Sequence, residues 1–440
     1  MKKRNLFLFI GLFLIFQLLV GSSWAAQKGK IRVIFTDTYA PHVKRIETLI
    51  DEYKKANPEA EITLEVLTWG DVLPKVTATK AAGSPPDLLL IIPEQIWTLQ
   101  QQGWLLPTDD LIEKLGGDKF FRPLPAYVKL DGKHWCVPKG SSPLHLEYRK
   151  DLFEKKGLKE PRTWDDLLKA AKTLTEDLDG DGKIDRYGIS LPLKRDYAVA
   201  VMFASFMWGN GGSILDQHGK VVFNSPETVQ SLNFFKELYK YAPPGVTDYS
   251  WLQLVETYSQ DKAAMTIYSG MAPFSKAIET NPTVAQGTAV SPLPTRLSNQ
   301  TPRARWTTTA WSIMKDTKYP ELAKDFILFF FDVNRMIKYY HADPIFTGPG
   351  EKPVIESKEY WSNNVIQKYR HILEQYIKAA DGAIDPIMEH PGVMQPNTSI
   401  ILQRLIVTDC VQEVVLGKFS AEEAAARAHK RMEELVTKPK

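Results

Sequence analysis

Aromatic, carboxylate, amide and hydroxyl side chains gather in this sequence at the ends of predicted strands and in the breaks after helices. Flat aromatic rings pack against the CH faces of sugars, and carboxylates, amides and Arg bind hydroxyl groups. Because ligands of open α/β sheets bind at the carboxyl ends of the strands, we predict a small-molecule site there. The candidate ligand-binding residues are Asp37, Tyr39, Trp69, Glu94, Ser142, Trp208, Asn210, Ser269, Met271, Arg305 and Trp306.

Each of these side chains also has a structural alternative. An aromatic residue at a strand end often forms only the rim of a core, and Asp37 suits an Asx turn. Arg305, together with Arg303, could bind an anionic group such as phosphate or form a solvated pair. The sequence leaves these alternatives open.

One acidic loop has the spacing of a calcium-binding loop. Four carboxylates stand at positions 1, 3, 5 and 9 of the loop, and a Gly allows the sharp turn. Gly188 occupies position 12, where such loops carry a bidentate Glu. The loop is therefore either a calcium site or a metal-free connector rich in turn-forming residues. The four carboxylates are Asp177, Asp179, Asp181 and Asp185.

The sequence carries no recognisable catalytic motif. Its eight His residues show no His-x-x-x-His or Cys-His spacing that would indicate zinc. There is no G-x-S-x-G elbow, phosphate-binding Gly-Lys-Ser/Thr loop or dinucleotide fingerprint. Paired acids such as Asp165-Asp166 stand at predicted helix starts, where they compensate the helix dipole. We expect no catalytic residue, no enzyme activity and, calcium aside, no cofactor.

Residues 1–25 have the pattern of a cleavable secretory signal peptide. A basic head at residues 2–4 precedes an apolar run at residues 6–20, and Ser23-Trp24-Ala25 offers small residues to a signal peptidase. The run is short for a bilayer span, which needs about 20 apolar residues, so cleavage after Ala25 is favoured over a retained anchor. No Cys lies near this site for lipid attachment. We expect a soluble, exported protein, most simply a periplasmic one.

Charge and cysteine content limit the partners. The formal net charge is +3, and residues 2–4 carry three positive charges, so the chain without its signal peptide is neutral. A neutral chain with no basic stripe argues against nucleic acid or an anionic membrane as the main partner. Cys136 and Cys410 are far apart in sequence, and two separate buried thiols are favoured over a disulfide.

Hydrophobic periodicity predicts alternating strands and helices in the first part of the chain. Residues 87–92 form a continuous apolar run, typical of a strand buried on both faces of a parallel sheet. This alternation predicts a doubly wound α/β lobe. The expected strands are at 31–35, 61–67, 87–92, 187–191, 263–268, 288–294 and 308–314, with helices at 42–57, 70–82, 94–102, 196–208 and 319–331 and from residue 356 onward.

The order of segments along nearly the whole chain resembles one known family. From Cys136 to Ser190 a strand ending in Pro138 is followed by LHLEYRKDLFEKKGL, PRTWDDLLKAAKTLT, an acidic Gly-rich loop and RYGIS. GSPPDLLLIIPEQIWTLQQQGWLLPTDDLI, MWGNGGSILDQHGKVVFNSPETVQSLNFF and KAAMTIYSGMAPFSK stand in the matching order. Together they resemble bacterial extracellular solute-binding proteins of family 1, the maltose-binding-protein-like receptors of ABC importers.

The resemblance implies a two-lobed α/β fold of the type II periplasmic-binding-protein kind, with an interdomain cleft and a helical C-terminal region. It implies an N-lobe of residues 26–140 plus 292–345 and a C-lobe of residues 148–290 plus 350–440, joined by three crossings. The implied function is to capture a small solute, a mono- or oligosaccharide, by hinge closure. The implied partners are that carbohydrate ligand and the transmembrane permease subunits of an ABC transporter, and we expect a monomer.

Departures from the family pattern argue against a maltodextrin ligand. Ser269-Gly270-Met271 replaces a frequent Gly-Pro-Trp, and Arg305-Trp306-Thr307 replaces a common Gly-Gly. Residues 396–402 lack the late aromatic of maltose-type receptors. Two other functions stay open, a receptor for an anionic solute such as a glycerophosphodiester, with Arg303 or Arg305 as anchor, and a secreted carbohydrate-active enzyme with two cleft carboxylates.

Overall fold

The computed structural model describes residues 28–36, 39–120, 129–379, 389–390, 393 and 395–437. The predicted signal peptide, residues 1–25, and the candidate Asp37 fall outside these residues. Within the described stretches, none of the helices combines the length and the apolar character that a membrane crossing requires.

The first part of the chain alternates strands and helices, as its periodicity predicts. The parallel strand β1 pairs with β2 on one side and with β3 on the other. All four residues of β3 are buried, in agreement with their continuous apolar run. The elements are β1 (Gly29–Phe35), α1 (Ala40–Ala56), β2 (Ala60–Val66), α2 (Val72–Ala81), β3 (Leu88–Ile91), α3 (Pro93–Gln101) and α4 (Asp109–Leu115).

The sheet is mixed rather than wholly parallel. Strand β9 (Trp306–Ile313) returns from late in the sequence and inserts between β3 and β6 (Val137–Arg149), antiparallel to both. The strand order is β2-β1-β3-β9-β6-β7, with β8 also paired to β6. The sequence predicted a doubly wound α/β lobe built from the first part of the chain. In the structure, the sheet of that lobe also includes β9, an antiparallel strand from far along the chain.

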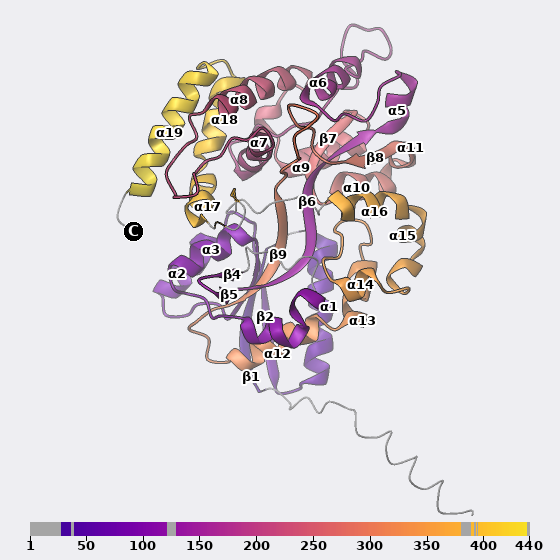
Figure 1. Cartoon of the computed structure of the whole chain (residues 1–440). Helices are drawn as coiled ribbons and strands as arrows, with labels where there is room; N and C mark the ends of the chain where they lie inside the picture. The colour runs from indigo at the N-terminus through magenta and orange to yellow at the C-terminus, as the bar shows by residue number, and fades with distance from the viewer. Residues whose placement is uncertain are drawn as a thin grey trace, which may run out of the picture.

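Strand β6 joins the two lobes (Figure 1). Its residues 137–143 pair with β9, whereas residues 144–149 pair with β7 (Met265–Ser269) and β8 (Thr288–Ser291). We call the part built around β1, β2, β3 and β9 the N-lobe, and the part built around β7 and β8 the C-lobe. The place where β6 leaves one set of partners for the other is the interlobe junction.

Helices cover both sheets and fill the C-terminal third (Figure 1). Local caps explain several starts, since Thr163 and Asp166 form a capping box and Ser420 and Glu423 bond each other's backbone N–H. The remaining elements are the hairpin β4 (Lys129–Leu130) and β5 (Lys133–His134), α5 (Lys150–Lys155), α6 (Trp164–Thr173), α7 (Tyr197–Gly209), α8 (Pro226–Leu238), α9 (Trp251–Ser259), α10 (Ala272–Thr280), α11 (Pro282–Gly287), α12 (Pro320–Phe330), α13 (Val333–His341), α14 (Lys352–Ile355), α15 (Asn364–Lys368), α16 (Arg370–Ala379), α17 (Pro396–Gln403), α18 (Ile406–Val415) and α19 (Ala421–Thr437).

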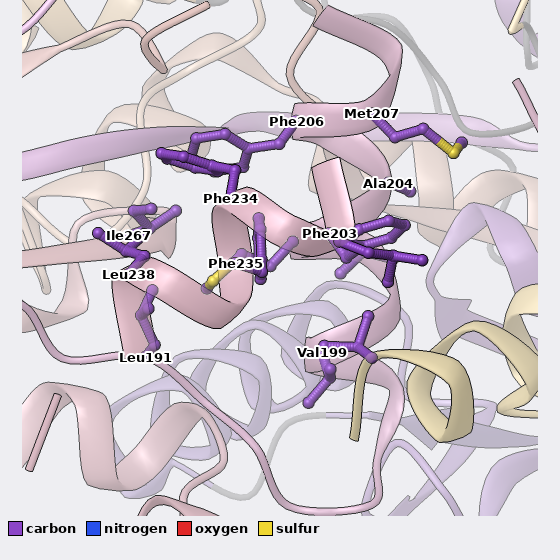
Figure 2. Packing of buried hydrophobic residues seen from close by; sticks show 14 of the residues in the cluster. Leu191, Val199, Phe203, Ala204, Phe206, Met207, Phe234, Phe235, Leu238 and Ile267 are labelled. Atoms are coloured by element: carbon purple, nitrogen blue, oxygen red, sulfur yellow. The ribbon is translucent and has the colours of Figure 1, made fainter. Parts of the chain in front are cut away.

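The core of the C-lobe is aromatic. Figure 2 shows Phe203 and Phe206 of α7 beside Phe234 and Phe235 of α8. The ring centroids of Phe206 and Phe235 lie 5.3 Å apart with an edge-to-face angle of 82°, a favourable arrangement for aromatic quadrupoles. Because these rings lock α7 onto α8, the start of α7 is held firmly in the C-lobe.

The N-lobe has two buried clusters, one on each face of its sheet. One cluster contains α2, α3 and Trp306, and the other contains α1, α12 and α13. The second cluster also takes in buried residues of α10 and α16, which the sequence resemblance assigns to the C-lobe. The predicted lobe boundaries stay predictions.

Two details of the sequence-based prediction are resolved by the packing. Residues 187–191 form only isolated bridges, from Tyr187 to Ala263 and from Ser190 to Thr266, so a continuous strand there was wrong. A Cβ at Gly188 would lie 1.9 Å from the carbonyl oxygen of Ala171, so this segment packs directly against the backbone of α6. Cys136 and Cys410 are both buried and are not joined in a disulfide, as predicted.

Candidate ligand-binding site

The carboxyl ends of strands from both lobes meet at the interlobe junction. Because β1, β2 and β3 are parallel, the segments that follow them leave the sheet at one edge. Tyr39, Trp69 and Glu94 stand in those segments. From the C-lobe, Ser269 at the end of β7 pairs with Leu144 of β6, next to the crossing. The fold thus places the predicted strand-end residues on the two sides of one junction.

Two exposed aromatic residues mark the N-lobe edge. Tyr39 and Trp69 are 38% and 39% exposed, which is unusual for large aromatic side chains. The ring of Tyr39 stacks on Phe346, with centroids 5.5 Å apart and planes at 16°. The carbonyl of Trp69 accepts a hydrogen bond from Gln95 Nε2 at 2.6 Å, which places Trp69 beside the start of α3. Sequence reasoning missed Phe346, whose one signal is its position just before the Gly348-Pro349-Gly350 break.

Glu94 and Arg305 form a buried ion pair at the junction. Both residues are almost fully buried, and Arg305 Nη2 and Nε lie 2.8 Å and 3.1 Å from Glu94 Oε1. The hydroxyl of Tyr197 donates to the same oxygen. The second oxygen, Glu94 Oε2, is buried and accepts no hydrogen bond from any described residue. Two predicted site residues are thus in direct contact, and Tyr197 is a third that the sequence did not reveal.

The other predicted residues at the junction are held mainly by the β6 crossing. Trp306 is buried, and its Nε1–H donates to Ser141 Oγ at 2.7 Å. Ser269 Oγ donates to the carbonyl of Ser142 at 2.9 Å. The side chain of Met271 is fully buried, so this segment presents backbone and hydroxyl groups rather than an aromatic face.

Trp208 and Asn210 make their hydrogen bonds with residues other than those described at the junction. Trp208 is fully buried within α7, and its indole N–H donates to Glu389 Oε2 at 3.2 Å. Asn210 Nδ2 donates to the carbonyl of Glu227, and Asn210 Oδ1 accepts from Arg296 Nε, both at 3.1 Å. These contacts favour the structural alternative for both residues. Helix α7 extends through Gly209, so the apparent loop aromatic is a core residue.

Glu389 and Arg303 lie together beside α7. Glu389 is fully buried and also accepts hydrogen bonds from Thr398 Oγ1, at 2.8 Å, and from the backbone N–H of Ile214. Burial raises the pKa of Glu389 to about 7, against the opposing effect of these donors. Arg303 donates to the backbone carbonyl of Glu389, and burial lowers the pKa of Arg303. Arg303 is therefore engaged by the protein itself.

Three of the four carboxylates predicted for the calcium site converge, and Asp181 is not among them, since its Oδ1 accepts the N–H of Lys183 at 2.8 Å. One oxygen each of Asp177, Asp179 and Asp185 lies within 4.8 Å of the others, and all three residues are exposed. The loop folds through its own bonds, since the N–H groups of Gly180 and Gly182 donate to Asp177. Those donors also lower the pKa of Asp177. Because such bonds form equally in a metal-free turn, calcium binding stays a prediction.

Comparison of the chain with known proteins identifies its family. The model of the family described as bacterial extracellular solute-binding protein matches residues 39–332. A binding protein of Brucella abortus is 29% identical over 277 residues, which are 61% of this chain and 64% of that protein. The chain therefore spans slightly less than two thirds of the length of that relative.

Solved structures share the fold over nearly the whole chain. The maltose-bound MalE3 of T. maritima matches with a TM-score of 0.77 and 22% identity, over 92% of this chain and 99% of that one. An ABC transporter solute-binding protein of Agrobacterium radiobacter in complex with ribitol also matches with a TM-score of 0.77 and 22% identity, over 93% and 99%. The fold is thus the two-lobed type II periplasmic-binding-protein fold, and the chain belongs to the bacterial extracellular solute-binding protein family.

Proposed function

We propose that this protein is a receptor that captures a small neutral carbohydrate or polyol between its lobes and delivers it unchanged to the permease of an ABC importer. It works outside the cytoplasm, in the periplasm, after residues 1–25 have directed export and been removed. It acts as a monomer and closes by a hinge at the junction.

The observation that carries this proposal is the pairing of an unsatisfied carboxylate with exposed aromatic rings. Glu94 Oε2 is buried without a donor among the described residues, and a buried acceptor left unsatisfied costs about 1–3 kcal/mol. A ligand hydroxyl supplies such a donor. Tyr39 and Trp69 are exposed in the segments that leave the same sheet edge, and aromatic faces suit the CH faces of sugars and polyols.

The charges at the junction favour a neutral ligand over an anionic one. Arg305 is neutralised by Glu94 at 2.8 Å, and Arg303 already donates to the carbonyl of Glu389. An anionic solute bound at Arg305 would have to displace Glu94, and separating that buried ion pair leaves an uncompensated charge. The glycerophosphodiester alternative is therefore less well supported.

The hydrogen bonds of Glu94 and Glu389 favour a binding role over glycoside hydrolysis. Glycoside hydrolysis needs two carboxyl groups that flank the scissile bond. Glu94 Oε1 is occupied by Arg305 and Tyr197, and both oxygens of Glu389 are bonded inside the core. Maltose and ribitol in solved structures of the same fold support a carbohydrate or polyol as the ligand class.

A thermal-shift screen tests the proposal on the protein without residues 1–25. The panel contains maltose, ribitol, D-mannitol, glycerophosphocholine and a neutral amino acid. We expect a sugar or polyol to raise the unfolding temperature by mass action, and mass spectrometry to recover it unchanged. Stabilisation by glycerophosphocholine alone would favour a glycerophosphodiester receptor, and conversion of the bound compound would favour the enzyme.

A further inference from the structure

We propose that Tyr197 is a positioning residue that holds the two lobes together in the binding-competent state, through its hydroxyl bond to Glu94. The inference rests on the proposed function, because it concerns the closed arrangement in which a ligand is retained. It assigns a role to a residue that neither the sequence motifs nor the family membership singles out.

Tyr197 and Glu94 are anchored in different cores. Tyr197 is the first residue of α7 and packs against the C-lobe core. The preceding residue, Asp196, caps the helix by accepting the N–H of Ala198 at 2.8 Å. Glu94 stands in the first turn of α3, and buried Ile96 and Trp97 fix that helix in the N-lobe cluster. The bond between Tyr197 and Glu94 therefore joins two separately packed bodies.

Arg305 completes the contact from the segment that passes out of the C-lobe core into β9. Its neighbours belong to different cores, Ala304 to that of the C-lobe and Trp306 to that of the N-lobe. The backbone N–H of Arg305 donates to Ser205 Oγ of α7 at 3.0 Å. Its guanidinium carbon lies 5.5 Å from the centroid of the Tyr197 ring and its nitrogens bond Glu94. Glu94 Oε1 thus accepts hydrogen bonds both from the Tyr197 hydroxyl of the C-lobe and from the Arg305 guanidinium.

The arrangement predicts how the lobes separate. Movement of α3 away from α7 breaks the Tyr197 bond. It also loads the pair of Arg305 with Glu94, because the backbone N–H of Arg305 is held by Ser205 of α7. A hydrogen bond from a hydroxyl to a buried carboxylate is charge-assisted and stronger than a neutral one. Because opening the lobes breaks this bond, the bond stabilises the closed state and slows ligand release. Tyr197 is therefore expected to act mainly on the dissociation rate.

The test compares Tyr197→Phe with the wild-type protein and with Tyr319→Phe. The Phe variant keeps the ring that packs on the C-lobe and faces Arg305, and removes only the hydroxyl. Tyr319 is a matched control, because it is 38% exposed and lies against Gly29, at the start of β1 and thus at the opposite sheet edge. Circular dichroism and thermal unfolding verify that each variant folds.

Two measurements test whether the Tyr197 hydroxyl holds the lobes together. Small-angle X-ray scattering of the ligand-free proteins is expected to give a larger radius of gyration for Tyr197→Phe than for the wild type and the control. Stopped-flow tryptophan fluorescence, with maltose and ribitol as probes, is expected to show dissociation about tenfold faster, for a bond worth about 1.4 kcal/mol, with association nearly unchanged. Glu94→Gln, which weakens the same contact from the other lobe, should also expand the ligand-free protein.

The outcomes separate this inference from the proposed function. Unchanged scattering in Tyr197→Phe overturns the inference, and so does unchanged dissociation of a probe that the wild type binds. If the wild type binds no sugar or polyol, the proposed function fails, and the scattering comparison still decides whether Tyr197 holds the lobes together.

Discussion

The carboxylate of Glu351 accepts the backbone N–H of Gly140 at 2.9 Å and so joins two connections between the lobes that are 211 residues apart in the chain. The other oxygen of Glu351 accepts the N–H of Gly350 and the hydroxyl of Tyr340. Beside them, the N–H of Ser141 donates to the carbonyl of Gly348 at 3.0 Å. The pairing of β6 with β9 also shifts register between Lys139 and Ser142. We infer that this point is where the lobes bend relative to each other.

The close approach of Gly140 and Gly350 predicts a steric effect of substitution. A Cβ on Gly350 would lie 2.8 Å from the carbonyl oxygen of Gly140, so Gly350→Ala must push the two connections apart. We expect the free energy of unfolding to fall by about 1–3 kcal/mol, measured by urea denaturation. Gly70→Ala is the matched control, because nothing lies within 4 Å of the added Cβ. Equal stability of the two variants would contradict the prediction.

The buried Glu389 predicts a pH dependence of stability. Its pKa is raised from 4.5 to about 7 by burial, so the folded protein binds this proton more tightly than the unfolded chain. The stability from this group is present below about pH 4.5 and is lost as the pH rises to about 7, up to about 3 kcal/mol in all.

The pH prediction is measured as a difference between proteins. Urea denaturation of wild type and Glu389→Gln at pH 4.5, 6 and 7.5 cancels the contribution of every other titrating group that the two proteins share. We expect the stability of the wild type relative to the variant to fall steadily with rising pH. Glu434→Gln, on the exposed face of α19, should show no such slope, and a slope of the opposite sign would refute the assignment.

The exposed ring of Trp69 predicts a loss of ligand affinity without a loss of stability. Trp69→Ala removes an aromatic face worth about 0.5–1.5 kcal/mol in a stacked contact, or up to about tenfold in Kd. The unfolding free energy should change by about 0.5 kcal/mol or less, because the side chain is 39% exposed. Isothermal titration with the best ligand of the thermal screen measures the first effect. Tyr319→Ala, equally exposed at the opposite edge, should leave the affinity unchanged.

The acidic loop predicts a stabilising effect of calcium. Bringing Asp177, Asp179 and Asp185 within 4.8 Å of one another concentrates negative charge that a hard cation would neutralise. We expect calcium chloride to raise the unfolding temperature after treatment with EGTA, and Asp177→Asn to abolish the rise. Magnesium, which demands smaller octahedral geometry, should act more weakly. No calcium-dependent shift in the wild type would identify the loop as a turn connector.

The sequence by itself determined the elements whose causes are local. The alternation of β1, α1, β2, α2 and β3 and the helix start at Asp165-Asp166 follow from short-range patterns and appear in the structure. The carboxyl-edge rule then placed Tyr39, Trp69 and Glu94 correctly at one edge. Periodicity and capping act within one helix or strand, so they can be read without the fold.

Only the tertiary structure decided which of these side chains meet. Tyr197 and Glu94 are 103 residues apart, and no local pattern encodes a contact between two separately packed helices. The sequence placed Trp208 in the break after a helix. In the structure, Trp208 is part of the buried core in which α7 packs against α8, and its indole N–H donates to Glu389. Side-chain partners depend on how distant segments pack together, because burial and hydrogen bonding are settled between elements and not within them.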